Sequence, residues 1–113
     1  MPERRVYERF ELLAHVELGH TNQIEILATI NISAGGLLLV NDRNVKVAIG
    51  ETIRIGFDVP DLAPAFAIDA IVVRVVAPTA KPGLVAAMWT SSDSVAIGSL
   101  AQVLWNLRKP ANP

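Results

Sequence analysis

The strongest constraint on the fold of this chain is a set of short segments in which apolar and polar residues alternate. Within residues 10–18 and 24–32 the even-numbered residues are apolar, so we expect them to face a core, with Leu27 and Thr29 on the opposite face. A period of two is typical of half-buried strands. Turn-forming residues separate the segments. The sequence predicts six strands, over residues 10–18, 24–32, 36–40, 52–59, 66–76 and 84–89.

The last segment of the chain has a different period. Apolar residues recur there at the three- and four-residue spacing of one helix face, at Ile97, Leu100, Leu104 and Leu107. Ser92 or Asp93 can cap the start of this helix, and Gly98 inside it costs about 1 kcal/mol relative to Ala. Six predicted strands and one helix indicate a mainly β fold. We expect the strands to close into a barrel, because closing a sheet removes its exposed edges. The predicted fold is a six-stranded antiparallel β-barrel with a C-terminal α-helix that plugs one mouth or covers one side.

Length and composition narrow the class of protein. A chain of 113 residues is one domain that needs no metal or disulfide to fold, and it has no Cys. No apolar run approaches the ~20 residues of a membrane-spanning helix. The first nine residues also lack the apolar core of a signal peptide, so we expect a cytoplasmic protein without membrane insertion. A net charge of -1 argues against binding to long nucleic acids, which depends on a broad basic face.

Two short motifs flank the first two predicted strands. Arg5 and Arg9 form an RxxxR motif, and an NxSxxG motif begins at Asn31, twenty-two residues after Arg9. Alone, the first is typical of solvated terminal charges, and the second of a tight turn in which Asn and Ser bond their own backbone. In this order, ahead of a barrel pattern, they resemble the signature of the PilZ domain family, RxxxR followed by (D/N)xSxxG. The resemblance implies a barrel with a C-terminal helix that is a receptor for the bacterial second messenger cyclic di-GMP.

The arginine motif is interpreted as a flexible N-terminal arm over residues 1–9, with the barrel and its helix over residues 10–109. Arg5 and Arg9 would close over the ligand, because a guanidinium donates paired hydrogen bonds to a phosphate or a guanine edge and stacks on bases. Family members with an arginine just before the motif tend to take up two intercalated cyclic di-GMP molecules. Arg4 occupies that position, so the resemblance implies two ligands per chain.

The second motif would form the other side of the site. Asn31 and Ser33 can together donate to and accept from a guanine Watson–Crick edge. Gly35 and Gly36 permit positive backbone dihedrals and leave no side chain between backbone and ligand. The family often has Asp at the first position, and Asn31 accepts hydrogen bonds less strongly than a carboxylate. Arg74, on the strand predicted over residues 66–76, aligns with a family position that often contacts the ligand.

Other functions find less support in the sequence. An enzyme is not expected, because Ser33 has no His or Asp at the spacing of a catalytic triad, and no acidic cluster could hold catalytic metals. His15 and His20 lack Cys and evident carboxylate companions, so no metal site is expected. A barrel binding single-stranded RNA would need several exposed aromatics. Trp89 and Trp105 are predicted to pack in the core or against the helix, with a partner surface as the alternative for Trp105.

The remaining rival is a PilZ-like module that binds other proteins, as in pilus assembly, without cyclic di-GMP. Such relatives typically lack the arginine motif, which this chain has. We therefore expect a single-domain cyclic di-GMP adaptor. Its signal would leave through a changed surface that an unidentified downstream protein reads, in motility, biofilm formation or a related process.

Overall fold

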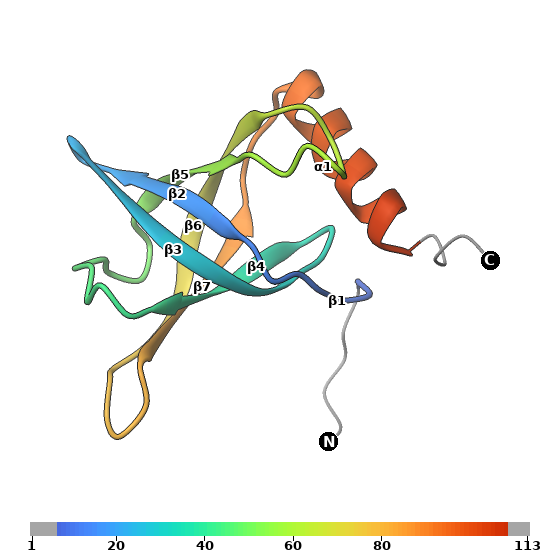
Figure 1. Ribbon diagram of the computed structural model, residues 1–113. Helices are drawn as coiled ribbons and strands as arrows, with labels where there is room; N and C mark the ends of the chain where they lie inside the picture. Colours follow the sequence, from blue (N-terminus) through green and yellow to red (C-terminus); the bar gives the residue numbers. More distant parts are fainter. Residues whose placement is uncertain (1–6, 109–113) are drawn as a thin grey trace, which may run out of the picture.

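The strands of this protein are antiparallel throughout and close into a barrel, in a computed structural model that describes residues 7–108 (Figure 1). The elements are β1 (Phe10–Glu11), β2 (His15–His20), β3 (Gln23–Ile32), β4 (Gly36–Asn41), β5 (Thr52–Phe57), β6 (Phe66–Val76), β7 (Gly83–Trp89) and α1 (Ser94–Arg108). The strand order is β1-β3-β2-β5-β6-β7-β4, and a further pairing of β3 with β4 closes the ring. The short β1 lies outside this ring, on β3. The predicted six-stranded antiparallel barrel with a C-terminal helix is confirmed.

Inward-facing side chains of the six strands fill the barrel. The largest fully buried ones are mostly Leu, Ile and Val, at Leu18, Leu27, Ile32, Leu39, Ile53, Ile55, Ile68, Val16, Val72 and Val85. Burying one such side chain contributes about 1.5–3 kcal/mol relative to leaving it in water. Phe57 stacks on Phe66 with ring centroids 4.9 Å apart, and the ring of Trp89 lies 6.1 Å from Phe57. Trp89 therefore packs against the core, as the sequence predicted.

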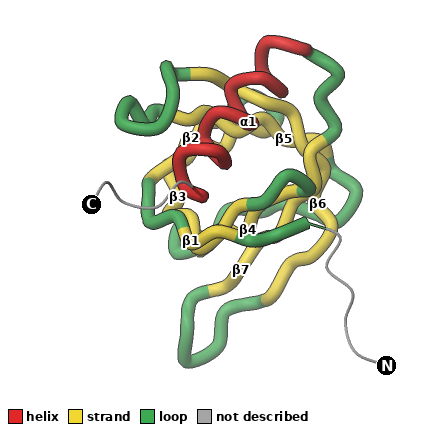
Figure 2. The backbone as a smooth tube through the Cα atoms, turned by 90° about the vertical axis from the view of Figure 1, so that its right-hand side faces the viewer, coloured by secondary structure: helices red, strands yellow, loops and turns green. Residues whose placement is uncertain are grey.

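The helix α1 lies across one end of the barrel (Figure 2). Asp93 caps it, because its Oδ1 accepts a hydrogen bond of 2.9 Å from the backbone N–H of Val95. Its buried residues are Ala96, Leu100 and Val103. The predicted packing face is wrong at Ile97, whose side chain is 45% exposed, because the buried stripe is rotated toward the smaller Ala96. Within residues 7–108, no helix has the length and apolar character needed to cross a membrane.

The two faces of β3 are reversed relative to the sequence prediction. Leu27 and Thr29 face the core, whereas Ile24 is 67% exposed and Ile26 is also exposed. Ile32 is nevertheless buried, because the pairing of β3 with β4 shifts register between Thr29 and Asn31. This β-bulge at Ile30 inserts an extra residue, so the alternation changes phase along the strand.

The predicted strand over residues 10–18 is also interrupted. β1 and β2 pair with the same edge of β3, but their registers differ by one residue, and exposed Leu13 lies at the break. The buried hydroxyl of Thr29 spans this irregularity. It accepts a hydrogen bond of 3.1 Å from the N–H of Ala14 and lies within hydrogen-bonding distance of the carbonyls of Leu12 and Ala14. A polar side chain inside the barrel thus stabilises the irregular backbone of the first strand.

We expect Thr29→Val to lower the free energy of unfolding by about 1–2 kcal/mol, because valine keeps the shape but leaves buried backbone groups without their hydroxyl partner. Urea denaturation followed by circular dichroism measures the change. Thr52→Val, at an exposed position of β5, is the matched control. Equal effects of the two substitutions would contradict the role given to Thr29.

Candidate functional site

A cleft of about 260 Å³ lies on the outer wall of the barrel, where β4, β6 and β7 adjoin the turn between β3 and β4. Leu38, Val73, Ala86 and Met88 supply apolar side chains to its lining. Six of the eight residues that the sequence predicted for a ligand site also line it, namely Arg9, Asn31, Ser33, Gly35, Gly36 and Arg74. The other two, Arg4 and Arg5, lie outside the described residues. Residues far apart in the chain therefore meet in one cleft.

Two β-bulges turn the polar residues of this site outward. In regular alternation Asn31 would face the core like Thr29, and Arg74 would face it like Val72. The register of β3 shifts between Thr29 and Asn31, and that of β6 shifts between Val72 and Arg74. Each shift adds one residue, so Asn31 and Arg74 line the cleft instead. Bulges commonly redirect side chains beside functional sites.

The turn that carries the second motif is held by its own serine. The Ser33 hydroxyl accepts hydrogen bonds from the N–H groups of Gly35 at 3.1 Å and Gly36 at 3.2 Å. The Trp89 indole Nε1–H donates to the Ser33 carbonyl at 3.0 Å, and the Trp89 backbone N–H donates to the Gly35 carbonyl at 3.0 Å. The tight-turn interpretation is confirmed for Ser33. Ser33 nevertheless forms part of the cleft wall.

The two glycines of the motif are needed for close approach, not for unusual dihedrals. Glycine would permit a positive φ at these two positions, but neither has one, because the only glycine with positive φ among residues 7–108 is Gly50. A Cβ on Gly35 would lie 2.7 Å from Cδ2 of Tyr7, and a Cβ on Gly36 would lie 2.0 Å from the carbonyl oxygen of Ala87. The glycines let the segment before β1 and the strand β7 pack directly on the turn.

Sequence reasoning missed two residues that shape the site. Tyr7 packs against Gly35, and Trp89 anchors the turn through Ser33. Tyr7 lies inside the RxxxR motif, and this position is the sequence signal that could have indicated its role in the site. Trp89 was identified only as a core residue, because its hydrogen bond joins residues that are 56 positions apart.

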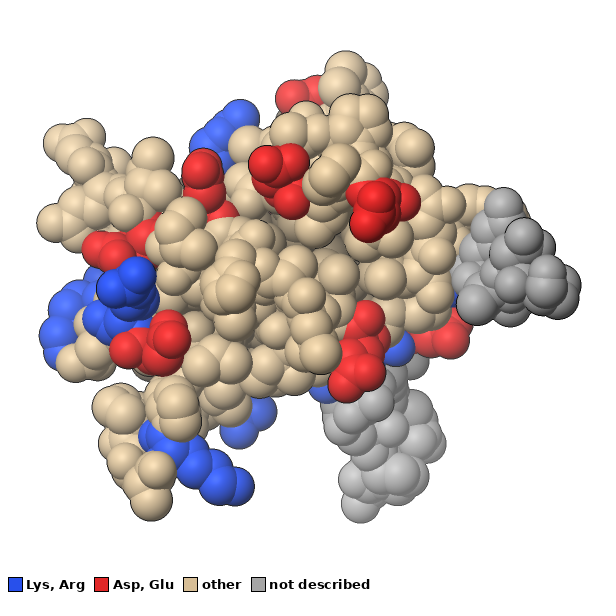
Figure 3. Space-filling model, in the orientation of Figure 1, with Lys and Arg blue, Asp and Glu red and all other residues tan. Residues whose placement is uncertain are grey.

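The described lining of the cleft is cationic. It contains Arg9 and Arg74 together with the amide of Asn31, and it includes no Asp or Glu. Elsewhere the charges are mixed: Arg54 pairs with Asp69 at 2.8 Å on the exposed surface, and Figure 3 shows both signs of charge on one face of the molecule. Two guanidinium groups and an amide around one cleft suit a ligand that carries phosphates and hydrogen-bonding bases.

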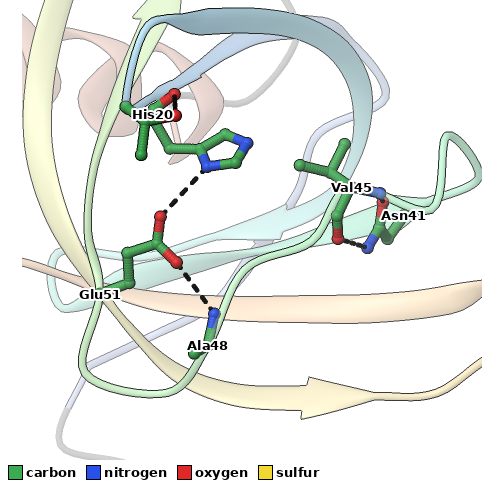
Figure 4. A network of polar contacts seen from close by, with 6 residues as sticks. His20, Asn41, Val45, Ala48 and Glu51 are labelled. Carbon is green, nitrogen blue, oxygen red and sulfur yellow. Dashed lines mark hydrogen bonds and ion pairs between the residues drawn. The ribbon is translucent and has the colours of Figure 1, made fainter.

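His20, for which the sequence indicated no carboxylate companion, lies beside a carboxylate in the fold (Figure 4). His20 Nδ1 lies 3.1 Å from a carboxylate oxygen of Glu51, and the other oxygen accepts a 3.0 Å hydrogen bond from the N–H of Ala48. Asn41 exchanges two hydrogen bonds with the backbone of Val45 in the same loop. These contacts fasten the loop between β4 and β5. Among residues 7–108, no three His, Cys, Asp or Glu side chains gather as a metal site would require.

The closed barrel, the helix across its end and the cationic cleft on its wall define a small β-barrel domain suited to an anionic ligand. The chain belongs to the PilZ domain family, whose family model matches residues 3–104. The family resemblance noted in the sequence is thereby confirmed. No curated protein matches the sequence.

Solved structures show the same fold. The K. pneumonia MrkH–c-di-GMP complex has a TM-score of 0.76 at 17% identity, over 94% of this chain and 53% of that one. The Bacillus subtilis inhibitor of motility MotI/DgrA has a TM-score of 0.72 at 18% identity, over 93% and 51%. The PilZ domain of Escherichia coli YcgR with c-di-GMP has a TM-score of 0.68 at 14% identity, over 93% and 92%. The chain thus spans about half the length of the first two proteins.

Proposed function

We propose that this protein is a receptor for cyclic di-GMP that acts in the cytoplasm as an adaptor. The observation that carries the proposal is the meeting of Arg9, Asn31 and Arg74 in one cleft lined by no described acidic residue. Membership of the PilZ domain family supports it. Two of the similar structures, those of MrkH and YcgR, contain c-di-GMP.

Each polar residue has a separate task in the proposed complex. Arg9 and Arg74 pair with phosphates or guanine edges, since a guanidinium matches both in a bidentate manner. Asn31 hydrogen-bonds a guanine base, while Ser33 keeps the turn in shape and so holds Asn31 in place. Gly36 adds backbone surface without a side chain.

Residues 1–9 form the ligand-binding arm in this proposal, and residues 10–109 form the barrel with its helix. The cleft of about 260 Å³ falls below the common size of enclosed ligand pockets, roughly 300–1,000 Å³. The described wall therefore offers one side of the site, and the arm with Arg4 and Arg5 supplies the other. Arg4 further supports two intercalated ligands, because a third guanidinium in the arm, beside those of Arg5 and Arg9, offsets the repulsion between four phosphates.

The signal passes to a downstream protein through the surface that the arm and the barrel wall form together. Tyr7 connects the two, because it packs on Gly35 while Arg9, two residues later, lines the cleft. The ligand can change this surface for a partner only if the ligand binds one state of the surface more tightly than another. A PilZ-like interaction module that works without the ligand is the alternative that the following experiment decides.

Isothermal titration with cyclic di-GMP tests the proposed function. We expect saturable binding with two ligands per chain, and a much weaker response to cyclic di-AMP, because the arginines and Asn31 would recognise guanine edges. Arg4→Ala should lower the ratio toward one. Equal affinity for the two dinucleotides would refute guanine recognition, and absence of binding would favour the ligand-independent module.

A further inference from the structure

The outer face of α1 is unusually apolar for a helix at a surface. From Ser94 to Asn106 the helix has no charged residue, although the side of a surface helix that meets solvent is ordinarily charged or polar. Trp105 is 64% exposed on this face. We propose that the outer face of α1 binds the same face of a second copy of this chain. The two helices would form an antiparallel pair related by a two-fold axis.

Gly98 and Trp105 are complementary in such a pair. Glycine is a poor helix former, and a Cβ on Gly98 would have no neighbour within 4 Å, so packing within the chain does not require it. Trp105 lies seven residues later, two turns along the same face. An axis between Ala101 and Gln102 brings Trp105 of one copy opposite Gly98 of the other, because each is three residues beyond the axis pair. The indole then fills the space that glycine leaves open.

The charges at the two ends of the helix fit the same register. Arg108, in the last turn, comes opposite Val95 of the second copy, two residues from Asp93, the capping residue. Each end of a symmetric pair therefore holds one residue of each charge, Arg108 of one copy and Asp93 of the other. The antiparallel arrangement also places the positive end of each helix dipole beside the negative end of the other. A parallel pair would place like charges together.

The surface beside the helix extends the contact. A groove of about 360 Å³ runs between α1 and residues 7–10, at the start of β1, and its lining includes Tyr7, Phe10, Leu104 and Trp105. A helix of 15 residues is only about 22 Å long, so one helix pair covers less than the roughly 800 Å² per partner of a standard interface. We therefore expect a reversible dimer with a dissociation constant on the order of micromolar.

Sedimentation velocity of the full chain without ligand tests the proposal. Over about 5 to about 500 μM, we expect the weight-average mass to rise from monomer to dimer, since this range brackets a micromolar constant. Tryptophan fluorescence should shift to shorter wavelength over the same range, because the exposed indole of Trp105 leaves water on pairing, whereas Trp89 already packs against the core. A monomer at every concentration would overturn the proposal and assign the face to a different protein.

Two substitutions separate this interface from an effect on folding. Gly98→Leu adds a strong helix former at an open position, so we expect the melting temperature to be no lower than that of the wild type. It should nevertheless weaken dimerisation at least about tenfold, because leucine occupies the space for the indole. Trp105→Ala should weaken it similarly. Ile24→Ala, which removes an exposed side chain from β3, is the control and should leave the dimer unchanged. A dimer that persists in both interface variants would refute this pairing.

Discussion

Gly36→Ala should lower the free energy of unfolding by about 3 kcal/mol or more, the largest effect on stability that we expect from a single methyl group in this protein. The added Cβ would lie 2.0 Å from the carbonyl oxygen of Ala87. Because that atom belongs to the backbone of a paired strand, it cannot rotate away as a side chain could. β4 and β7 would have to separate where Gly36 pairs with Met88.

Urea denaturation at low protein concentration measures this loss. Gly98→Ala is the matched control, since its Cβ would meet nothing within 4 Å and alanine favours a helix over glycine by about 1 kcal/mol. The two substitutions add the same atom group and should change stability in opposite directions. A small loss at Gly36 would mean that β7 moves away at little cost, and would contradict the close approach as the reason for this glycine.

The architecture could be predicted because strand periodicity and turn residues are local signals. The long, largely apolar segment over residues 66–76 predicted β6 with its observed bounds, and the capping role of Asp93 was among the predictions for the helix. Closure of the barrel followed from the need to pair strand edges. Each of these inferences depends on residues close together in the sequence.

The orientation of β3 could not be predicted in the same way. Every even-numbered residue of β3 is apolar, whereas Leu27 is the only apolar residue at an odd-numbered position, so the pattern favoured the wrong face. In the fold, Leu27 is buried and the hydroxyl of Thr29 bonds to the backbone between β1 and β2. That requirement is a tertiary one, and a hydroxyl gives no hydrophobic signal.

The candidate site was recognisable from its motifs, but its geometry was not. The β-bulges at Ile30 and Val73 decide that Asn31 and Arg74 face outward. The sequence did contain a sign of the second bulge. Arg74 lies two residues after Val72, so regular alternation would place both side chains in the core. An arginine there implies either a buried charge, which is costly, or a change of phase. The motifs thus indicate which residues belong to the site, whereas the strand registers of β3 and β6 determine where the side chains lie.

Arg9→Ala should weaken cyclic di-GMP binding by about 1–3 kcal/mol, roughly five- to 150-fold, as expected for the loss of one bidentate contact to a guanine or phosphate. This expectation rests on the proposed function and on the place of Arg9 in the cleft lining, beside the turn that carries Asn31. The barrel should remain folded, because Arg9 precedes β1 and its side chain is exposed.

Isothermal titration of the two proteins gives the ratio of affinities, and circular dichroism establishes that the variant is folded. Arg54→Ala is the control arginine. It pairs with Asp69 on the exposed surface and does not line the cleft, so its loss removes the same charge from the protein at little cost in stability. We expect its affinity to stay within about twofold of the wild type, less than ~0.5 kcal/mol. If both variants bound more weakly by the same factor, the net charge of the protein rather than a contact from Arg9 would govern binding. If both bound as tightly as the wild type, the arm would have no direct part in the site.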